Sequence, residues 1–123
     1  MQVAIARESP QLIKVEIAGR LSSDQWHAAL ADLAKLLKAG ERTSILIMAE
    51  RFEGWEPGDW EDLSFQRDYD ERIGRMAIVA EAKWEGQALM FTGKGLRGAV
   101  EIEFFTPAEI GRARQWLESA RRP

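Results

Sequence analysis

The sequence contains no cysteine and a single histidine, His27. Without cysteine the chain forms no disulfide bonds, thiolate nucleophiles, iron–sulfur clusters or cysteine-ligated zinc sites. One histidine does not build a histidine-rich metal centre. The 17 Lys and Arg residues do not outnumber the 20 Asp and Glu residues, so there is no excess positive charge for nucleic acid. We therefore predict no cofactor, no bound metal and no nucleic-acid partner.

Long apolar runs are also missing. No stretch approaches the roughly 20 apolar residues that span a bilayer, and the first residues lack the basic and then apolar pattern of a signal peptide. The 123 residues are 46% hydrophobic and 30% charged, which suits one core with a solvated surface. We expect a cytoplasmic protein with a single domain over residues 1–123 and no membrane span.

Five segments have the apolar patterns of β-strands. Residues 45–49 and 76–80 are continuous apolar runs, too short for helices, which indicates strands covered on both faces. Residues 3–7 and 12–19 alternate in polarity around a Ser-Pro-Gln turn and predict an antiparallel hairpin. Apolar residues alternate with glutamates over 100–104, which places this strand near an edge of the sheet.

The first predicted helix has clear start and stop signals. Ser22 and Gln25 have capping-box spacing, in which two side chains satisfy two free backbone amides. A stripe of apolar residues with a period near 3.6 follows, and Gly40 is the predicted end of the helix. The stripe consists of Trp26, Leu30, Leu33 and Leu37.

The remaining helical signals complete the architecture. Thr106, Pro107 and Glu109 form a capping box with proline at the first helical position. Residues 57–72 and 83–91 carry weaker helical patterns. The order β-β-α-β-α-β-α-β-α predicts an α/β fold, with a mixed, mostly parallel five-stranded sheet and four helices.

No catalytic motif emerges. Residues 93–98 match G-x-G-x-x-G, but they follow a predicted helix and precede a strand, whereas the dinucleotide fingerprint needs the reverse. His27 lies beside the apolar stripe, where we expect it to be partly exposed, and no nucleophile pairs with it. Glu53, Glu56 and Asp59 lack the spacing of a calcium loop. We therefore predict that the protein is not an enzyme.

Negative charge is concentrated in one segment. Residues 50–71 contain nine acidic and two basic side chains, although the whole chain has a formal charge of only −3. Such a run is typical of a solvated helix face that complements the helix dipole, or of a patch that docks a basic partner. The predicted docking patch consists of Glu53, Glu56, Asp59, Glu61 and Asp62.

Aromatic residues follow the two inner strands. In an open parallel sheet, binding crevices form at the carboxyl ends of the strands, and Trp55 and Trp84 come soon after such ends. The rings predict either a cap over the core or a rim that binds a protein or a small apolar ligand, and a large exposed patch would also favour a homodimer. The predicted rim consists of Arg20, Arg51, Phe52, Trp55, Lys83 and Trp84.

At these residues the sequence resembles the SpoIIAA-like family of small bacterial single-domain proteins. The family is related to STAS domains and is sometimes grouped with lipid-binding Sec14-like domains. The resemblance spans nearly the whole chain. It is carried by Phe52-Glu53-Gly54-Trp55, by Ile73 and Arg75-Met76-Ala77-Ile78-Val79, by Lys83-Trp84, by Glu101-Ile102-Glu103-Phe104-Phe105, and by Ala113, Trp116 and Leu117.

The resemblance implies the SpoIIAA-like fold. In sporulation anti-sigma-factor antagonists with this fold, a serine near the start of the second helix is phosphorylated and switches partner binding. Here no Ser or Thr lies between Ala49 and Leu63, and Ser64 comes too late to match. We therefore expect a non-catalytic interaction module without the phospho-switch. The alternative is a carrier of a small molecule or lipid, with an aromatic-rimmed pocket at the strand ends.

Overall fold

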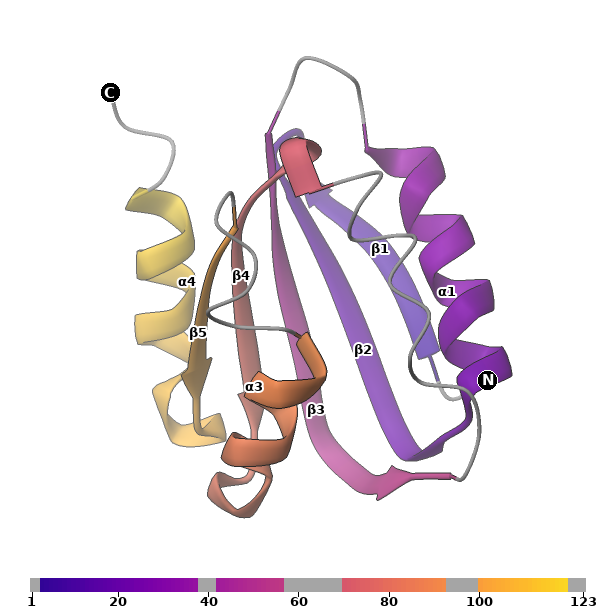
Figure 1. Ribbon diagram of the computed structural model, residues 1–123. Coiled ribbons are helices and arrows are strands. Elements are labelled where there is room, and N and C mark those ends of the chain that lie inside the picture. Colours follow the sequence, from indigo (N-terminus) through magenta and orange to yellow (C-terminus); the bar gives the residue numbers. More distant parts are fainter. Residues whose placement is uncertain (1–2, 38–41, 57–69, 93–99, 120–123) are drawn as a thin grey trace.

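The computed structural model describes residues 3–37, 42–56, 70–92 and 100–119. These residues form a five-stranded sheet in the order β1-β2-β3-β4-β5, so each strand pairs with its neighbour in sequence (Figure 1). Strands β1 and β2 are antiparallel, and every later pair is parallel. The predicted mixed, mostly parallel sheet is confirmed. The strands are β1 (Val3–Ser9), β2 (Leu12–Leu21), β3 (Thr43–Trp55), β4 (Ile73–Ala80) and β5 (Glu101–Phe105).

Three α-helices lie in the described part of the chain. They are α1 (Ser23–Leu36), α3 (Glu85–Thr92) and α4 (Ile110–Ser119), and the last two are each preceded by a short 3-10 turn. The weak pattern over 83–91 therefore does form a helix. The predicted helix over 57–72 lies mostly outside the described residues, apart from a 3-10 turn at Asp70–Arg72.

Helix α1 begins as predicted and ends earlier. The Ser22 hydroxyl accepts from the Gln25 amide at 3.1 Å, and the Gln25 side chain accepts from the Ser22 amide at 3.4 Å. The helix ends at Leu36 instead of Gly40, which lies outside the described residues. Two arginines explain this end, because Arg7 donates to the Leu36 carbonyl and Arg72 to the Leu37 carbonyl. They satisfy helix-end carbonyls that an isolated helix leaves free.

The sheet is covered on both faces, which gives two cores. Helices α1 and α3 pack on one face, over residues such as Ile45, Ile47 and Ile78 (Figure 1). Helix α4 packs on the other face, where Leu46, Ala77, Val79, Ala113 and Leu117 are 2% exposed or less. Neighbours in β3 and β4 thus face opposite cores, which is why those strands read as unbroken apolar runs.

Helix α4 is held at both ends. The predicted capping box of Thr106 and Glu109 is present. Near the carboxyl end, Arg75 of β4 donates to the Trp116 carbonyl at 2.6 Å and to Glu101 at 2.7 Å. Its guanidinium carbon also lies 4.9 Å from the centre of the Trp116 ring. Arg75 therefore ties the helix to the β4–β5 edge of the sheet.

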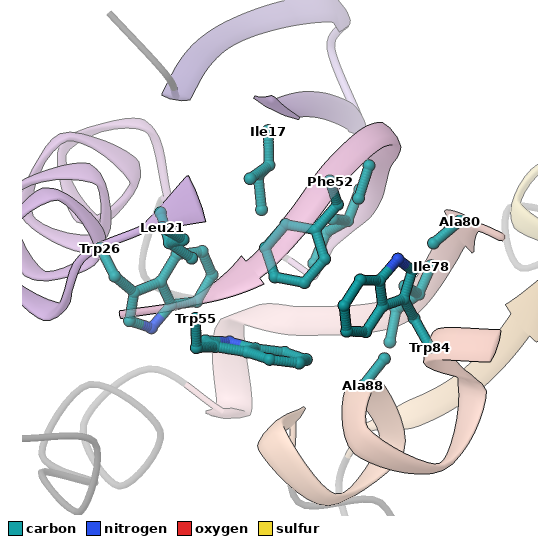
Figure 2. A pocket seen from close by; sticks show the side chains of 11 residues that line it. Ile17, Leu21, Trp26, Phe52, Trp55, Ile78, Ala80, Trp84 and Ala88 are labelled. Carbon is teal, nitrogen blue, oxygen red and sulfur yellow. The ribbon is translucent and has the colours of Figure 1, made fainter. Parts of the chain in front are cut away.

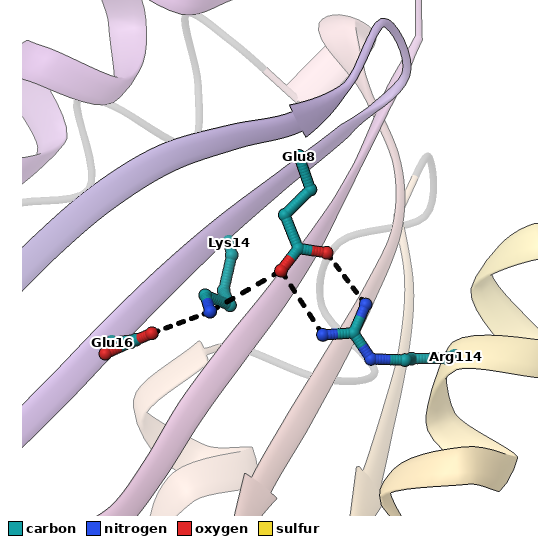
Figure 3. Close-up of polar contacts among 4 residues, drawn as sticks. All are labelled: Glu8, Lys14, Glu16 and Arg114. Carbon is teal, nitrogen blue, oxygen red and sulfur yellow. Dashed lines mark hydrogen bonds and ion pairs between the residues drawn. The ribbon is translucent and has the colours of Figure 1, made fainter.

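A polar network links β1, β2 and α4 on the same face (Figure 3). The Arg114 guanidinium donates to both carboxylate oxygens of Glu8, at 2.7 and 3.2 Å, and Lys14 lies 3.5 Å from Glu8 and 2.7 Å from Glu16. The bonds from Arg114 lower the pKa of Glu8. The hydrogen bond from Lys14 to Glu16 raises the pKa of Lys14, because it favours the charged ammonium group. The network fastens α4 to the β1–β2 hairpin.

Candidate functional site

The site is built at the carboxyl end of β3, which is longer than the sequence predicts. Arg51, Phe52 and Trp55 were expected in the loop after a strand ending at Ala49, but they belong to the strand. Two register shifts against β2 let this happen. Each shift adds one residue to β3, so that Phe52 and Trp55 both lie on the face covered by α1 and α3.

Two glycines beside the rings have a positive φ. Gly19 of β2 has φ 72° and pairs with Phe52, so the neighbouring strand presents no side chain beside that ring. Gly54 has φ 118°, and a Cβ built there lies 3.5 Å from Cη2 of Trp84. Side chains rarely adopt this backbone conformation, which is why glycine stands at both positions, and Trp84 packs against Gly54.

Phe52, Trp55 and Trp84 form one aromatic cluster (Figure 2). The Phe52 ring centre lies 4.7 Å from that of Trp55 and 5.2 Å from that of Trp84. The two indoles are 5.9 Å apart, and all three pairs meet edge to face, which is the favoured geometry of aromatic pairs. Phe52 is buried at 7% exposure, whereas both tryptophans are partly exposed. The sequence-predicted rings therefore do come together.

Beneath the cluster lies a small cavity, which we call the recess (Figure 2). Its volume is about 40 Å³. An engineered apolar cavity that binds benzene measures about 150 Å³, so the recess holds only a few non-hydrogen atoms. It is lined entirely by apolar and aromatic residues, namely Ile17, Leu21, Trp26, Ile47, Ala49, Phe52, Trp55, Ile78, Ala80, Trp84 and Ala88.

Two of the three predicted cations contact the aromatic cluster. Nη2 of Arg20 lies 3.4 Å from the Trp55 carbonyl oxygen. Nζ of Lys83 lies 5.3 Å from the centre of the Trp84 ring and 3.6 Å from Oε2 of Glu81. Arg51 is exposed on β3. The cluster thus carries a cation beside each tryptophan.

The predicted acidic patch is described only in part. Glu53 and Glu56 are exposed, and the Glu56 amide donates to the Leu21 carbonyl at 2.8 Å, which joins β2 to β3. Asp59, Glu61 and Asp62 lie outside the described residues. At least two of the five carboxylates therefore lie at the same end of the sheet as the rings.

Only three of the eleven residues that line the recess, Phe52, Trp55 and Trp84, belong to the rim predicted from the sequence. Trp26, predicted as part of the apolar stripe of α1, lines the recess, and so do Leu21 and Ala88, which no sequence motif marks. Their position follows from α1 and α3 packing on one face of the sheet. No local sequence motif predicts this packing. Trp26 does stand at the start of a helix that directly follows a strand, which indicates that it lies near the carboxyl end of that strand.

The described residues contain no group of three or more His, Cys, Asp and Glu side chains that could hold a metal ion. His27 is half-buried, as expected. None of the described helices is both long and apolar enough to cross a membrane. What the arrangement offers is an apolar recess, aromatic edges and exposed charges.

Comparisons with known proteins agree with the fold. The SpoIIAA-like family model matches residues 12–118. An uncharacterised protein with a SpoIIAA-like fold from Shewanella loihica PV-4 superposes with a TM-score of 0.69 at 20% identity, over 94% of this chain and 91% of that one. The unphosphorylated anti-sigma factor antagonist SpoIIAA superposes with a TM-score of 0.60 at 16% identity, over 92% of this chain and 96% of that one. No curated protein matches the sequence.

Proposed function

Because the chain belongs to the SpoIIAA-like family, we propose that it is a non-catalytic binding domain that works as a protein–protein interaction module. The observation that carries the proposal is the cluster of Phe52, Trp55 and Trp84 at the end of the sheet. Tryptophan and arginine supply much of the binding energy at protein interfaces, where they lie near the centre of the contact and surrounding residues exclude water. The partly exposed tryptophans, with Arg20 in contact with the Trp55 carbonyl, have that composition.

The proposed module has no serine switch of the anti-sigma-factor type. No Ser or Thr occurs between Ala49 and Leu63, where glutamates stand instead. Their fixed negative charge opposes the addition of phosphate. The apolar lining of the recess likewise supports binding over catalysis, because acid–base chemistry needs polar groups at the reacting atoms. Cytoplasmic location and homodimer formation stay predictions.

Site-specific crosslinking tests the proposed surface. A photoreactive amino acid at Lys83, which is exposed beside the Trp84 ring, should capture a partner in cells that express the protein, whereas the same group at Ala31, exposed on α1, should not. Trp55→Ala should weaken the captured complex about thirtyfold, the effect of losing roughly 2 kcal/mol at an interface hot spot. Circular dichroism of the variant checks its folding. Equal capture from both positions, or a folded variant that binds normally, contradicts the proposal.

The recess favours a second candidate, the binding of a small apolar ligand. An apolar cavity of about 40 Å³ at the carboxyl end of parallel strands lies where α/β domains hold ligands. Its size limits the enclosed part of a ligand to a small group, so a whole lipid chain needs the rings to move apart. Native mass spectrometry of protein purified from its host tests this function directly. A mass equal to the bare chain in every preparation argues against it.

A further inference from the structure

We propose that the recess binds short aliphatic carboxylates, with the hydrocarbon end enclosed and the carboxylate at the rim beside Arg20 and Lys83. The inference rests on the second proposed function, because it names the class of ligand that the recess accepts. Two independent features define the ligand. The volume and lining of the recess define its hydrocarbon end, and Arg20 and Lys83 define its charged head group.

The hydrocarbon part follows from volume and polarity. The recess measures about 40 Å³. At 10–15 Å³ per water-sized probe it has room for about three such probes, and scaling from the benzene-binding cavity gives about two non-hydrogen atoms. An ethyl, propyl or isopropyl group is of this size. Water is disfavoured in the same space, because an ordered water needs two to four polar partners and the lining residues are apolar or aromatic.

The head group follows from the charges beside the two tryptophans. Arg20 meets the Trp55 carbonyl through one long contact of 3.4 Å, which engages a single nitrogen of a group with five N–H donors. Lys83 lies over Trp84, whose ring centre is 5.9 Å from that of Trp55. We place the head group of a ligand that fills the recess at its rim, where Arg20 lies beside Trp55 and Lys83 beside Trp84.

Acidic side chains also lie at this end of the sheet, but their repulsion of a bound carboxylate is weak. Glu81 lies 3.6 Å from Lys83, so its charge is partly neutralised by the ion pair. Glu53 and Glu56 are exposed, where water and salt screen their repulsion. An alkylammonium ion, in contrast, would be repelled by Arg20 beside Trp55 and by Lys83 beside Trp84. The ligand class is thus an acid.

Titrations of the ¹⁵N-labelled full chain test the proposal. The five tryptophans give five indole N–H signals, assigned from Trp→Phe variants. Propionate, butyrate and hexanoate, added at constant ionic strength, should shift the signals of Trp55 and Trp84 and leave that of Trp116, on the other face of the sheet, in place. Butyrate should bind about fourfold more tightly than propionate, because one more methylene is buried. Hexanoate should gain nothing further, because the recess is full.

Matched variants separate the recess from the rest of the surface. Ala88→Leu adds three carbon atoms to the lining and should abolish the shifts while the melting temperature stays equal or rises. Ala31→Leu, on the exposed face of α1, is the control and should bind butyrate normally. Ala49→Val is a milder filling variant if Ala88→Leu fails to fold, and it should weaken butyrate severalfold. Butyrate binding that stays as tight as in the unmodified chain, in either folded filling variant, overturns the proposal.

Head-group variants and analogues test the acid. Arg20→Gln and Lys83→Gln should each weaken butyrate about threefold, as expected for exposed charges, and leave 1-butanol unchanged. If 1-butanol or butylammonium binds as tightly as butyrate, the carboxylate assignment is wrong while ligand binding by the recess stands. If neither butyrate nor 1-butanol causes a saturable shift, the second proposed function fails together with this inference.

Discussion

Replacing Phe52 with leucine separates the aromatic contacts of the cluster from simple burial. Phe52 is 7% exposed and meets two rings edge to face, at 4.7 and 5.2 Å. Leucine keeps an apolar side chain of similar size at the site but removes both ring pairs, each of which contributes about 0.5–1.5 kcal/mol beyond burial. We therefore expect Phe52→Leu to lower the free energy of unfolding by about 2 kcal/mol.

Urea denaturation followed by tryptophan fluorescence measures this loss. With a slope of about 2 kcal/mol per molar urea, typical of a small domain, the midpoint should fall by roughly 1 M. Phe105→Leu is the matched control, because Phe105 has one ring contact described here, with Trp116 at 6.0 Å, and should lose about half as much. A double-mutant cycle of Phe52→Leu with Trp84→Leu should return a coupling of about 1 kcal/mol.

The reasoning is refuted if Phe52→Leu costs no more than Phe105→Leu, or if the cycle shows no coupling with Trp84. Either result means that the rings pack as ordinary apolar volume. A confirmed loss shows instead that the cluster stabilises the end of the sheet. The partly exposed tryptophans then form a rigid surface. Such a surface suits binding because its side chains lose little conformational entropy when a partner binds.

Three further predictions concern single positions. The hydrogen bonds from Arg114 lower the pKa of Glu8 in the folded protein. The ionised Glu8 side chain therefore stabilises the fold at pH values above the ordinary glutamate pKa, and this stabilisation is lost as the pH falls through the lowered pKa. Glu8→Gln should flatten the acid side of a plot of unfolding free energy against pH. Arg75→Lys should cost about 1–2 kcal/mol in urea denaturation, since lysine cannot reproduce the bonds to Glu101 and Trp116, whereas Arg112→Lys, in an exposed pair with Glu109, should cost under about 0.5 kcal/mol. Gly54→Ala should lower the melting temperature through about 1–3 kcal/mol of strain at φ 118°, while Gly86→Ala, with open space in α3, should raise it slightly.

The central part of the fold was predictable because its signals are local. The apolar runs over 45–49 and 76–80 are strands buried on both faces, and the capping boxes at Ser22 and Thr106 start helices where they were expected. Each pattern depends on residues a few positions apart, so the polarity of neighbours is enough to read it. The edge position of the alternating strand over 100–104 was readable for the same reason.

What the sequence concealed depends on distant partners. The last residues of β3 look like a loop because Arg51 and Glu53 interrupt the apolar run, and only pairing with β2 through two register shifts makes them a strand. Helix α1 ends at Leu36 because Arg7 and Arg72, about 30 residues away on either side, bind its last carbonyls. The rim residues were found as a group, but the recess beneath them depends on how α1 and α3 pack.

The position of α4 also governs how the chain folds as it is made. One face of the sheet is covered by this helix, over Leu46, Ala77 and Val79, which are fully buried. Strands β3 and β4 leave the ribosome well before residues 110–119, so their apolar side chains stay bare while the rest is synthesised at about 5–20 residues per second. During that interval the exposed apolar face makes the nascent chain prone to aggregate. A chain truncated before Ile110 lacks α4, so this face of its sheet stays exposed.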